Sequence, residues 1–154
     1  MDSAELQNAV LAISPQLKLR EKADRPAVEV PPSGFLELMT TLSSDPKFSF
    51  DMLCAHSCID WSAKEQFELF YQLYSTTNRH YLMVSVFLPR ANAEAHSVRN
   101  IWEIAEWHER EVYDMFGVRY SGHNDLRRIL LEDDWKGHPL LKDYKDDFML
   151  ERPW

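Results

Sequence analysis

The chain has 154 residues, and its 25 acidic side chains against 17 basic ones give a formal net charge of −8. Its 45% hydrophobic and 12% aromatic residues are enough for the core of one globular domain. The acidic balance, without any run rich in Lys or Arg, argues against nucleic-acid binding. The longest run free of Asp, Glu, Lys and Arg, residues 6–17, contains Pro15 and is too short to span a bilayer. No basic flank leads into an apolar segment at the N-terminus, so we expect a cytoplasmic chain without a signal peptide.

The first third of the sequence predicts a helix, a short strand and a second helix. Apolar residues recur at helical spacing over residues 4–13, and Pro15 ends that segment. The stretch "AVEVPP" at residues 27–32 is typical of a short strand stopped by prolines. Ser33 is expected to cap a helix over residues 34–42.

Three strand-like segments follow, at residues 48–61, 66–75 and 80–89. They are rich in β-branched and aromatic residues, which strands favour. The connections, residues 62–65 and 76–79, are short enough for hairpins. We therefore predict an antiparallel sheet.

The stretch "LCAHSCID" raises the possibility of a metal site. In a regular strand the side chains of Cys54, His56 and Cys58 would share one face. Zinc sites, however, usually space their cysteines around a tight turn, and the sequence has no second ligand cluster of that kind. Two buried free thiols are the favoured interpretation, and a stand-alone zinc or thiol protein is kept as an alternative.

A long amphipathic helix is predicted between Ser97, as its N-terminal cap, and Gly117, as the left-handed residue that ends it. Glu109 falls on the apolar stripe of this helix, where a carboxylate is costly unless it is paired. We predict that it forms an internal or interfacial salt bridge with Arg127 or Arg128. Two weak pairs are expected on a neighbouring helix face: Glu106 with Arg110, and Arg110 with Asp114. The apolar stripe consists of Val98, Ile101, Trp102, Ala105, Val112 and Phe116.

Beyond Gly117 the helical periodicity fades, and three of the four glycines lie in this last third of the chain. We therefore predict an α+β domain over residues 1–120, an antiparallel β-sheet packed with helices, followed by an extended C-terminal arm over residues 121–154. Aromatic residues, arginine and isolated apolar side chains suit the arm for binding a partner and predict poor solubility without one. Its apolar residues are Leu126, Ile129, Leu130, Trp135, Leu140 and Leu141.

The sequence contains no pattern typical of an enzyme. Glu109 and Glu111 would point about 200° apart on a helix, so they cannot act on one substrate. No phosphate-binding glycine loop and no nucleophile elbow occur. His123 and His138 match no standard metal spacing, and we expect both to be hydrogen-bonded or partly exposed residues of turns.

The stretch "EREVYDMFGVRYSGHNDLRRIL" resembles the signature of the 30 kDa-type subunit of proton-pumping NADH:quinone oxidoreductases (respiratory complex I). The continuation "DDWKGHPLLKDY" and the upstream segments "CIDW" and "FELFYQLYS" extend the resemblance over roughly residues 48–144. The residues that carry it, and that it assigns to a partner interface, are Glu109, Arg110, Glu111, Asp114, Met115, Phe116, His123, Arg127, Arg128, Ile129, Leu130, Trp135, His138 and Pro139.

The resemblance implies a non-catalytic scaffold subunit in the peripheral arm of such a complex, on the cytoplasmic side of the cell membrane. It would hold no cofactor of its own: FMN, iron–sulfur clusters and quinone belong to partner subunits. Its partners would be the quinone-site subunit, which resembles a hydrogenase large subunit, and the iron–sulfur subunits. The same role in a related complex with another electron donor (ferredoxin, reduced F420 or hydrogen) remains open.

Overall fold

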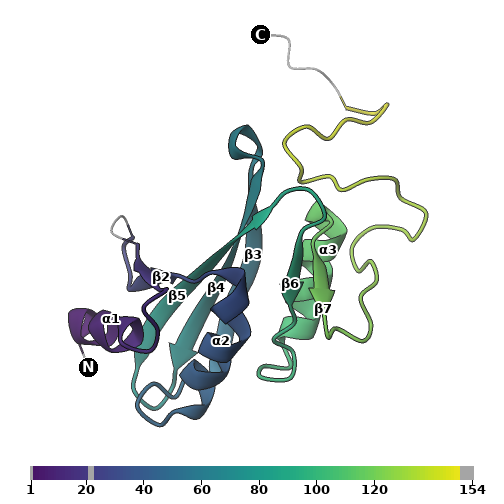
Figure 1. Ribbon diagram of the computed structural model, residues 1–154. Coiled ribbons are helices and arrows are strands. Elements are labelled where there is room, and N and C mark those ends of the chain that lie inside the picture. Colours follow the sequence, from purple (N-terminus) through teal and green to yellow (C-terminus); the bar gives the residue numbers. More distant parts are fainter. Residues whose placement is uncertain (1, 21–22, 150–154) are drawn as a thin grey trace.

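A computed structural model describes residues 2–20 and 23–149 of the chain (Figure 1). Five strands form a mixed sheet in the order β1-β2-β5-β4-β3, and a second sheet consists of β6 and β7. The α+β class predicted from the sequence is confirmed. In chain order the elements are α1 (Ser3–Leu11), β1 (Lys18–Leu19), β2 (Ala27–Glu29), a 3-10 turn η1 (Pro32–Gly34), α2 (Phe35–Ser44), β3 (Met52–Trp61), a 3-10 turn η2 (Ser62–Lys64), β4 (Gln66–Ser75), β5 (His80–Pro89), β6 (Glu94–His96), α3 (Ala105–Phe116) and β7 (Arg119–Ser121).

The three central strands pair as the sequence predicted, β3 with β4 and β4 with β5, both antiparallel. Their hairpins turn where Glu65 and Arg79 adopt positive φ angles of 52° and 54°. The pairing of β2 with β5, in contrast, is parallel, with Val28 opposite Val84. This pairing joins segments far apart in sequence, so the local pattern carries no signal for it.

The core lies on one face of the large sheet, beneath α2 and α3. Alternate residues of β4, from Phe67 to Leu73, are buried, and Tyr71 packs against Phe35 of α2 with ring centroids 4.9 Å apart. On the side of α3, Trp102 donates from its indole N–H to the carbonyl of Phe50 at 3.1 Å. None of the helices in residues 2–20 and 23–149 combines the length and the apolarity needed to cross a membrane.

Two of the predicted helix caps are wrong. Ser33 lies inside η1, and α2 begins after Gly34 without a side-chain cap. Ser97 lies well before α3, because a series of turns from Val98 to Ile104 precedes the helix, which begins at Ala105. Gly117 does end α3 in the left-handed conformation, at φ +80°, as predicted.

Beyond β7, residues 122–149 contain no helix or strand and run along the outside of α3 (Figure 1). We call this segment the arm; residues 150–154 of the predicted arm lie outside the described residues. Part of its apolar surface packs on the core, through Leu126, Leu131 and Leu141. Its path is therefore fixed by contacts with the domain.

Candidate functional site

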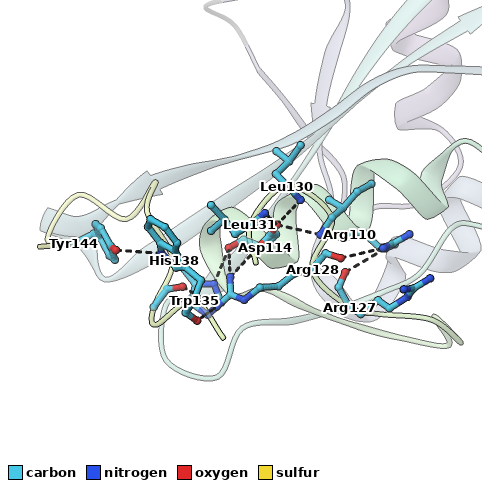
Figure 2. A network of polar contacts seen from close by, with 11 residues as sticks. Arg110, Asp114, Arg127, Arg128, Leu130, Leu131, Trp135, His138 and Tyr144 are labelled. Atoms are coloured by element: carbon cyan, nitrogen blue, oxygen red, sulfur yellow. Dashed lines mark hydrogen bonds and ion pairs between the residues drawn. The ribbon is translucent and has the colours of Figure 1, made fainter. Parts of the chain in front are cut away.

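Asp114, near the end of α3, is the centre of the contacts between α3 and the arm (Figure 2). Its side chain is fully buried, and one carboxylate oxygen accepts the guanidinium of Arg128 at 2.6 Å. The other oxygen accepts three consecutive backbone N–H groups, from Ile129 at 3.1 Å, Leu130 at 2.8 Å and Leu131 at 3.0 Å. Burial alone would raise the pKa of Asp114, but the N–H of Leu131, the guanidinium of Arg128 and the other two N–H groups together lower it. A single carboxylate thus fixes the first part of the arm.

Arg128 and Arg110 fix the arm's backbone around this carboxylate. Arg128 donates from its second nitrogen to the carbonyls of Trp135 and Gly137, both at 2.9 Å, and so closes the following turn of the arm. Arg110, which is buried, donates to the carbonyls of Arg127 at 3.2 Å and Arg128 at 3.0 Å. Both guanidiniums therefore satisfy backbone carbonyls that the irregular arm leaves without partners.

His138 fixes the arm against the end of α3. Its Nδ1–H donates to the carbonyl of Asp114 at 2.9 Å, and the N–H of Leu140 donates to the carbonyl of Met115 at 3.1 Å. The ring lies so close to Gly117 that a Cβ atom there would stand 2.7 Å from its Cδ2. Gly117 is thus required twice, for its backbone angle and for this contact.

A second anchor, which the sequence reasoning missed, lies farther along the arm. Asp60 of β3 is buried and accepts Arg90 through two bonds of 3.0 Å, and it also accepts the N–H of Lys142 at 2.9 Å. Arg90 in turn binds Asp143 of the arm. One feature could have indicated that Asp60 is buried: it continues the alternation of buried residues that runs from His56 through Cys58 in β3.

The predicted salt bridge of Glu109 with Arg127 or Arg128 is wrong. Glu109 is fully buried on the apolar stripe, as the helical spacing indicates, but it accepts the hydroxyl of Ser97 at 2.6 Å and the N–H of Val98 at 2.8 Å. Burial raises its pKa to about 7, and these two hydrogen bonds oppose the rise. Glu109 therefore holds the turns before α3 on the helix.

The predicted i,i+4 pairs are also wrong. Glu106 pairs with Arg99 at 2.8 Å, and Asp114 pairs with Arg128, so Arg110 is left to bind backbone carbonyls. Arg127 forms an ion pair at 2.9 Å with Asp125, on the surface. The turns before α3 and the folded arm offer closer partners than the helix face does.

The remaining signature residues have separate places. His123 donates from Nε2–H to the carbonyl of Glu106 at 3.2 Å and accepts the N–H of Asp125 on Nδ1, as expected for a histidine in a turn. Glu111 is exposed, and Pro139 is half-buried. Trp135 donates from its indole N–H to the hydroxyl of Tyr144 at 3.2 Å. Met115 and Phe116 belong to the core, where Phe116 meets Phe67 edge to face.

The cysteine-rich strand does not bring together the residues of the zinc alternative. The pairing of β3 with β4 shifts between Leu53 and Ala55, so Cys54 is exposed while His56 and Cys58 are buried. The expectation of two buried thiols is therefore wrong for Cys54. Both nitrogens of His56 are engaged, with the carbonyl of Phe70 at 3.0 Å and the hydroxyl of Tyr120 at 2.6 Å. Burial lowers the pKa of His56 to about 3 and raises the pKa of Cys58 to about 12. Within residues 2–20 and 23–149, no three His, Cys, Asp or Glu side chains converge to hold a metal ion.

Several apolar side chains of the arm are open to solvent, among exposed charged ones. Leu130 is 63% exposed, Leu140 is 51% exposed and Phe148 is 93% exposed. Trp107 of α3 is also exposed, and Arg110 lies over its ring, 5.4 Å from the centroid. The arm thus uses its polar groups to bind its own domain and turns several apolar side chains outward.

The chain is thus an α+β domain whose irregular C-terminal arm is fixed by the pair of Asp114 and Arg128. The family model for the respiratory-chain NADH dehydrogenase 30 kDa subunit matches residues 28–147, and the chain belongs to this family. The C subunit of the NADH-quinone oxidoreductase of Moorella thermoacetica is 40% identical over 131 residues, covering 85% of this chain and 87% of that protein. Its counterpart from Geobacter metallireducens is 35% identical over 148 residues, covering 92% and 90% of the two chains.

Two solved structures share the fold. A trypsin-resistant fragment of Nqo5 superposes with a TM-score of 0.69 at 24% identity, covering 80% of this chain and 98% of that one. A chain of the membrane-bound sulfane sulfur reductase, an archaeal respiratory membrane complex, superposes with a TM-score of 0.73 at 23% identity, covering 85% and 77%. At these identities the likeness establishes the fold.

Proposed function

We propose that the chain is a structural subunit of the hydrophilic peripheral arm of a complex I-type NADH:quinone oxidoreductase. In this role it docks against the quinone-site subunit that resembles a hydrogenase large subunit, and it contacts the iron–sulfur subunits. Electrons pass through FMN, iron–sulfur clusters and quinone in those partners, and this chain supports the assembly in which that transfer is coupled to proton translocation. It lies on the cytoplasmic side of the cell membrane, peripheral to it.

The observation that carries this proposal is that the arm binds its own domain through polar groups while several of its apolar side chains are exposed. Its polar side chains and backbone bind Asp114, Arg110, Asp60 and Arg90 of the domain, while Leu130, Leu140 and Phe148 face solvent. Exposed apolar side chains on a segment with a fixed path fit a protein–protein interface, because little conformational entropy of the arm is lost on docking.

The polar residues of the signature also support a structural role. The carboxylate of Asp114, the guanidiniums of Arg110 and Arg128, and the ring of His138 all bind groups of this same chain. Glu109 is enclosed with Ser97 and Val98. The first four side chains fix the arm, and Glu109 fixes the turns before α3, which agrees with a scaffold whose partners carry out the chemistry.

Affinity capture of the tagged chain from gently solubilised native membranes tests the proposal, with polypeptides identified by mass spectrometry and iron by elemental analysis. We expect recovery of the iron–sulfur subunits and the hydrogenase-like subunit, and the input subunits will identify the electron donor. The double variant Leu130→Glu, Leu140→Glu is expected to keep the thermal midpoint of the parent chain but to recover few partners.

Leu36→Glu is the matched control, because Leu36 is 39% exposed but lies on α2, outside the arm. It should recover partners as the parent chain does. Recovery of the parent chain alone under mild conditions, or undiminished capture by the double variant, would contradict the proposal.

A further inference from the structure

The outer edge of β6 carries backbone hydrogen-bonding groups without partners. β6 pairs with β7 in parallel, and the flanking bonds run from Arg119 N–H to the carbonyl of Ala93 and from Ser97 N–H to the carbonyl of Ser121. In a parallel ladder only alternate residues of a strand face its neighbour, so Glu94 and His96 direct their N–H and C=O groups away from β7. Within residues 2–20 and 23–149 these four groups form no hydrogen bond.

This edge borders a groove of about 270 Å³ between β6, β5 and the start of α2. Phe35, Val86 and Leu88, all buried, line its apolar part. A groove of this volume has room for an apolar side chain of a passing polypeptide. Unpaired strand edges with an adjacent pocket for side chains are the two parts of a strand-addition site.

The charged residue that lines the groove indicates which side chain a partner segment would place beside it. Among its lining residues Glu94 is the single carboxylate, and none is lysine or arginine. Glu94 is exposed and forms no ion pair within the part of the chain that the structure describes. Its side chain also lines the hollow beneath the arm, together with His138 and Leu141. The groove and the hollow beneath the arm share Glu94 as a lining residue, and this carboxylate favours a basic residue in the segment that occupies the groove.

We propose that the outer edge of β6 binds an extended segment of a partner subunit, which adds a third strand to the β6–β7 sheet. Its backbone pairs with Glu94 and His96, one apolar side chain enters the groove over Phe35, and a Lys or Arg faces Glu94. A helix could not supply this pairing, because its own N–H and C=O groups are already bonded. This inference rests on the proposed function, since the partner is a subunit of the same complex.

Amide hydrogen exchange tests it, measured on the isolated full chain and on the captured complex. The amides of Glu94 and His96 should exchange quickly in the isolated chain and about 100-fold more slowly in the complex. The amide of Ala95, bonded to β7 in both states, is the internal reference. Fast exchange in a complex that contains the partner subunits would overturn this inference alone. Recovery of the chain by itself would overturn the proposed function and this inference with it.

Two variants separate backbone pairing from charge. His96→Pro removes an N–H that the fold does not use, and should abolish the protection of Glu94 in the complex. Glu94→Gln keeps the N–H but removes the charge, and should release the segment severalfold faster at low salt. Glu103→Gln, also on an exposed glutamate but outside the groove and the signature, is the control and should change neither. Unchanged protection of Glu94 in His96→Pro would overturn the proposal. If that variant does not fold, an unchanged release rate in Glu94→Gln would overturn it.

Discussion

The imidazole of His138 lies directly on Gly117, where a Cβ atom would come within 2.7 Å of the ring. Gly117→Ala should therefore weaken the fold for two reasons, the left-handed backbone angle and the displacement of His138. The backbone angle alone costs about 1–2 kcal/mol. We expect a larger loss in the free energy of unfolding, together with faster tryptic cleavage in the arm, after Lys136 and Lys142.

Gly122→Ala is the matched control for this prediction. Gly122 has a similar φ of +85°, but a Cβ atom added there would have no other atom within 4 Å. This variant should show the cost of the backbone angle without release of the arm. Equal effects of the two substitutions on cleavage would contradict the role of the contact with His138.

Asp114→Asn should destabilise the chain strongly, because it removes the charge that pairs with Arg128 and that three backbone N–H groups share. Loss of one partner of a buried pair costs about 3–5 kcal/mol, and we expect the lower end because the amide oxygen can still accept some bonds. Urea unfolding measures the change. Asp125→Asn removes the exposed partner of Arg127 and should have little effect, and a similar loss in both variants would argue against the buried anchor.

Asp60 and Asp143 both bind the guanidinium of Arg90, but the two carboxylates differ in their exposure to solvent. The side chain of Asp60 is fully buried, whereas that of Asp143 is 66% exposed. Asp60→Asn should lower the free energy of unfolding by about 2–4 kcal/mol, because Arg90 and Lys142 N–H lose a buried anion. Asp143→Asn should leave it nearly unchanged, since solvent screens that pair. Thermal unfolding of both variants checks the difference, and equal midpoints would contradict it.

Glu109 should make the stability of the chain depend on pH. Its pKa is raised from 4.5 to about 7 in the folded state, so the folded chain holds a proton that the unfolded chain has released between these values. Stability contributed by the protonated form is therefore lost as the pH rises from about 4.5 to 7, up to about 3 kcal/mol. Glu109→Gln should lack this dependence, and its free energy of unfolding relative to the parent should increase over the same interval.

Urea unfolding at pH 5 and pH 8 measures the change in the free energy of unfolding across that interval. Comparing Glu109→Gln with the parent chain cancels the titration of all other groups. Glu111→Gln, which removes an exposed carboxylate from the same helix, should track the parent chain at both values. A constant difference between Glu109→Gln and the parent would show that burial does not shift the pKa of Glu109.

The sequence pattern predicted those parts of the fold that are determined by residues close together in the chain. The alternation in residues 66–75 and 80–89 matches β4 and β5, and Gly117 ends α3 where the periodicity stops. The part of the predicted stripe within α3, Ala105, Glu109, Val112 and Phe116, is buried as expected, because helical spacing alone fixes which residues share a face. Val98, Ile101 and Trp102 were wrongly placed on this helix and lie in the turns before it. The parallel pairing of β2 with β5 and the small β6–β7 sheet were not predicted, since each joins segments distant in sequence.

The sequence did not predict which groups the charged side chains bind, for the same reason. The sequence drew attention to Glu109, Arg110 and Asp114, but their partners are a hydroxyl, two carbonyls and an arm that folds back over α3. A charged side chain on a helix has many candidates in the sequence, and the tertiary fold decides between them. Asp60 was missed because a lone aspartate in a strand gives no indication of a cation 30 residues away at Arg90.

The two anchors of the arm differ greatly in the length of chain that they close. Asp114 holds residues 14 to 17 positions away, whereas Asp60 holds Lys142 across 82 positions. The first loop can close as soon as α3 has formed, but the second requires the finished hairpin of β3 and β4. The far end of the arm should therefore bind the domain after residues 128–131 have bound. The order in which the arm docks thus depends on completion of the sheet.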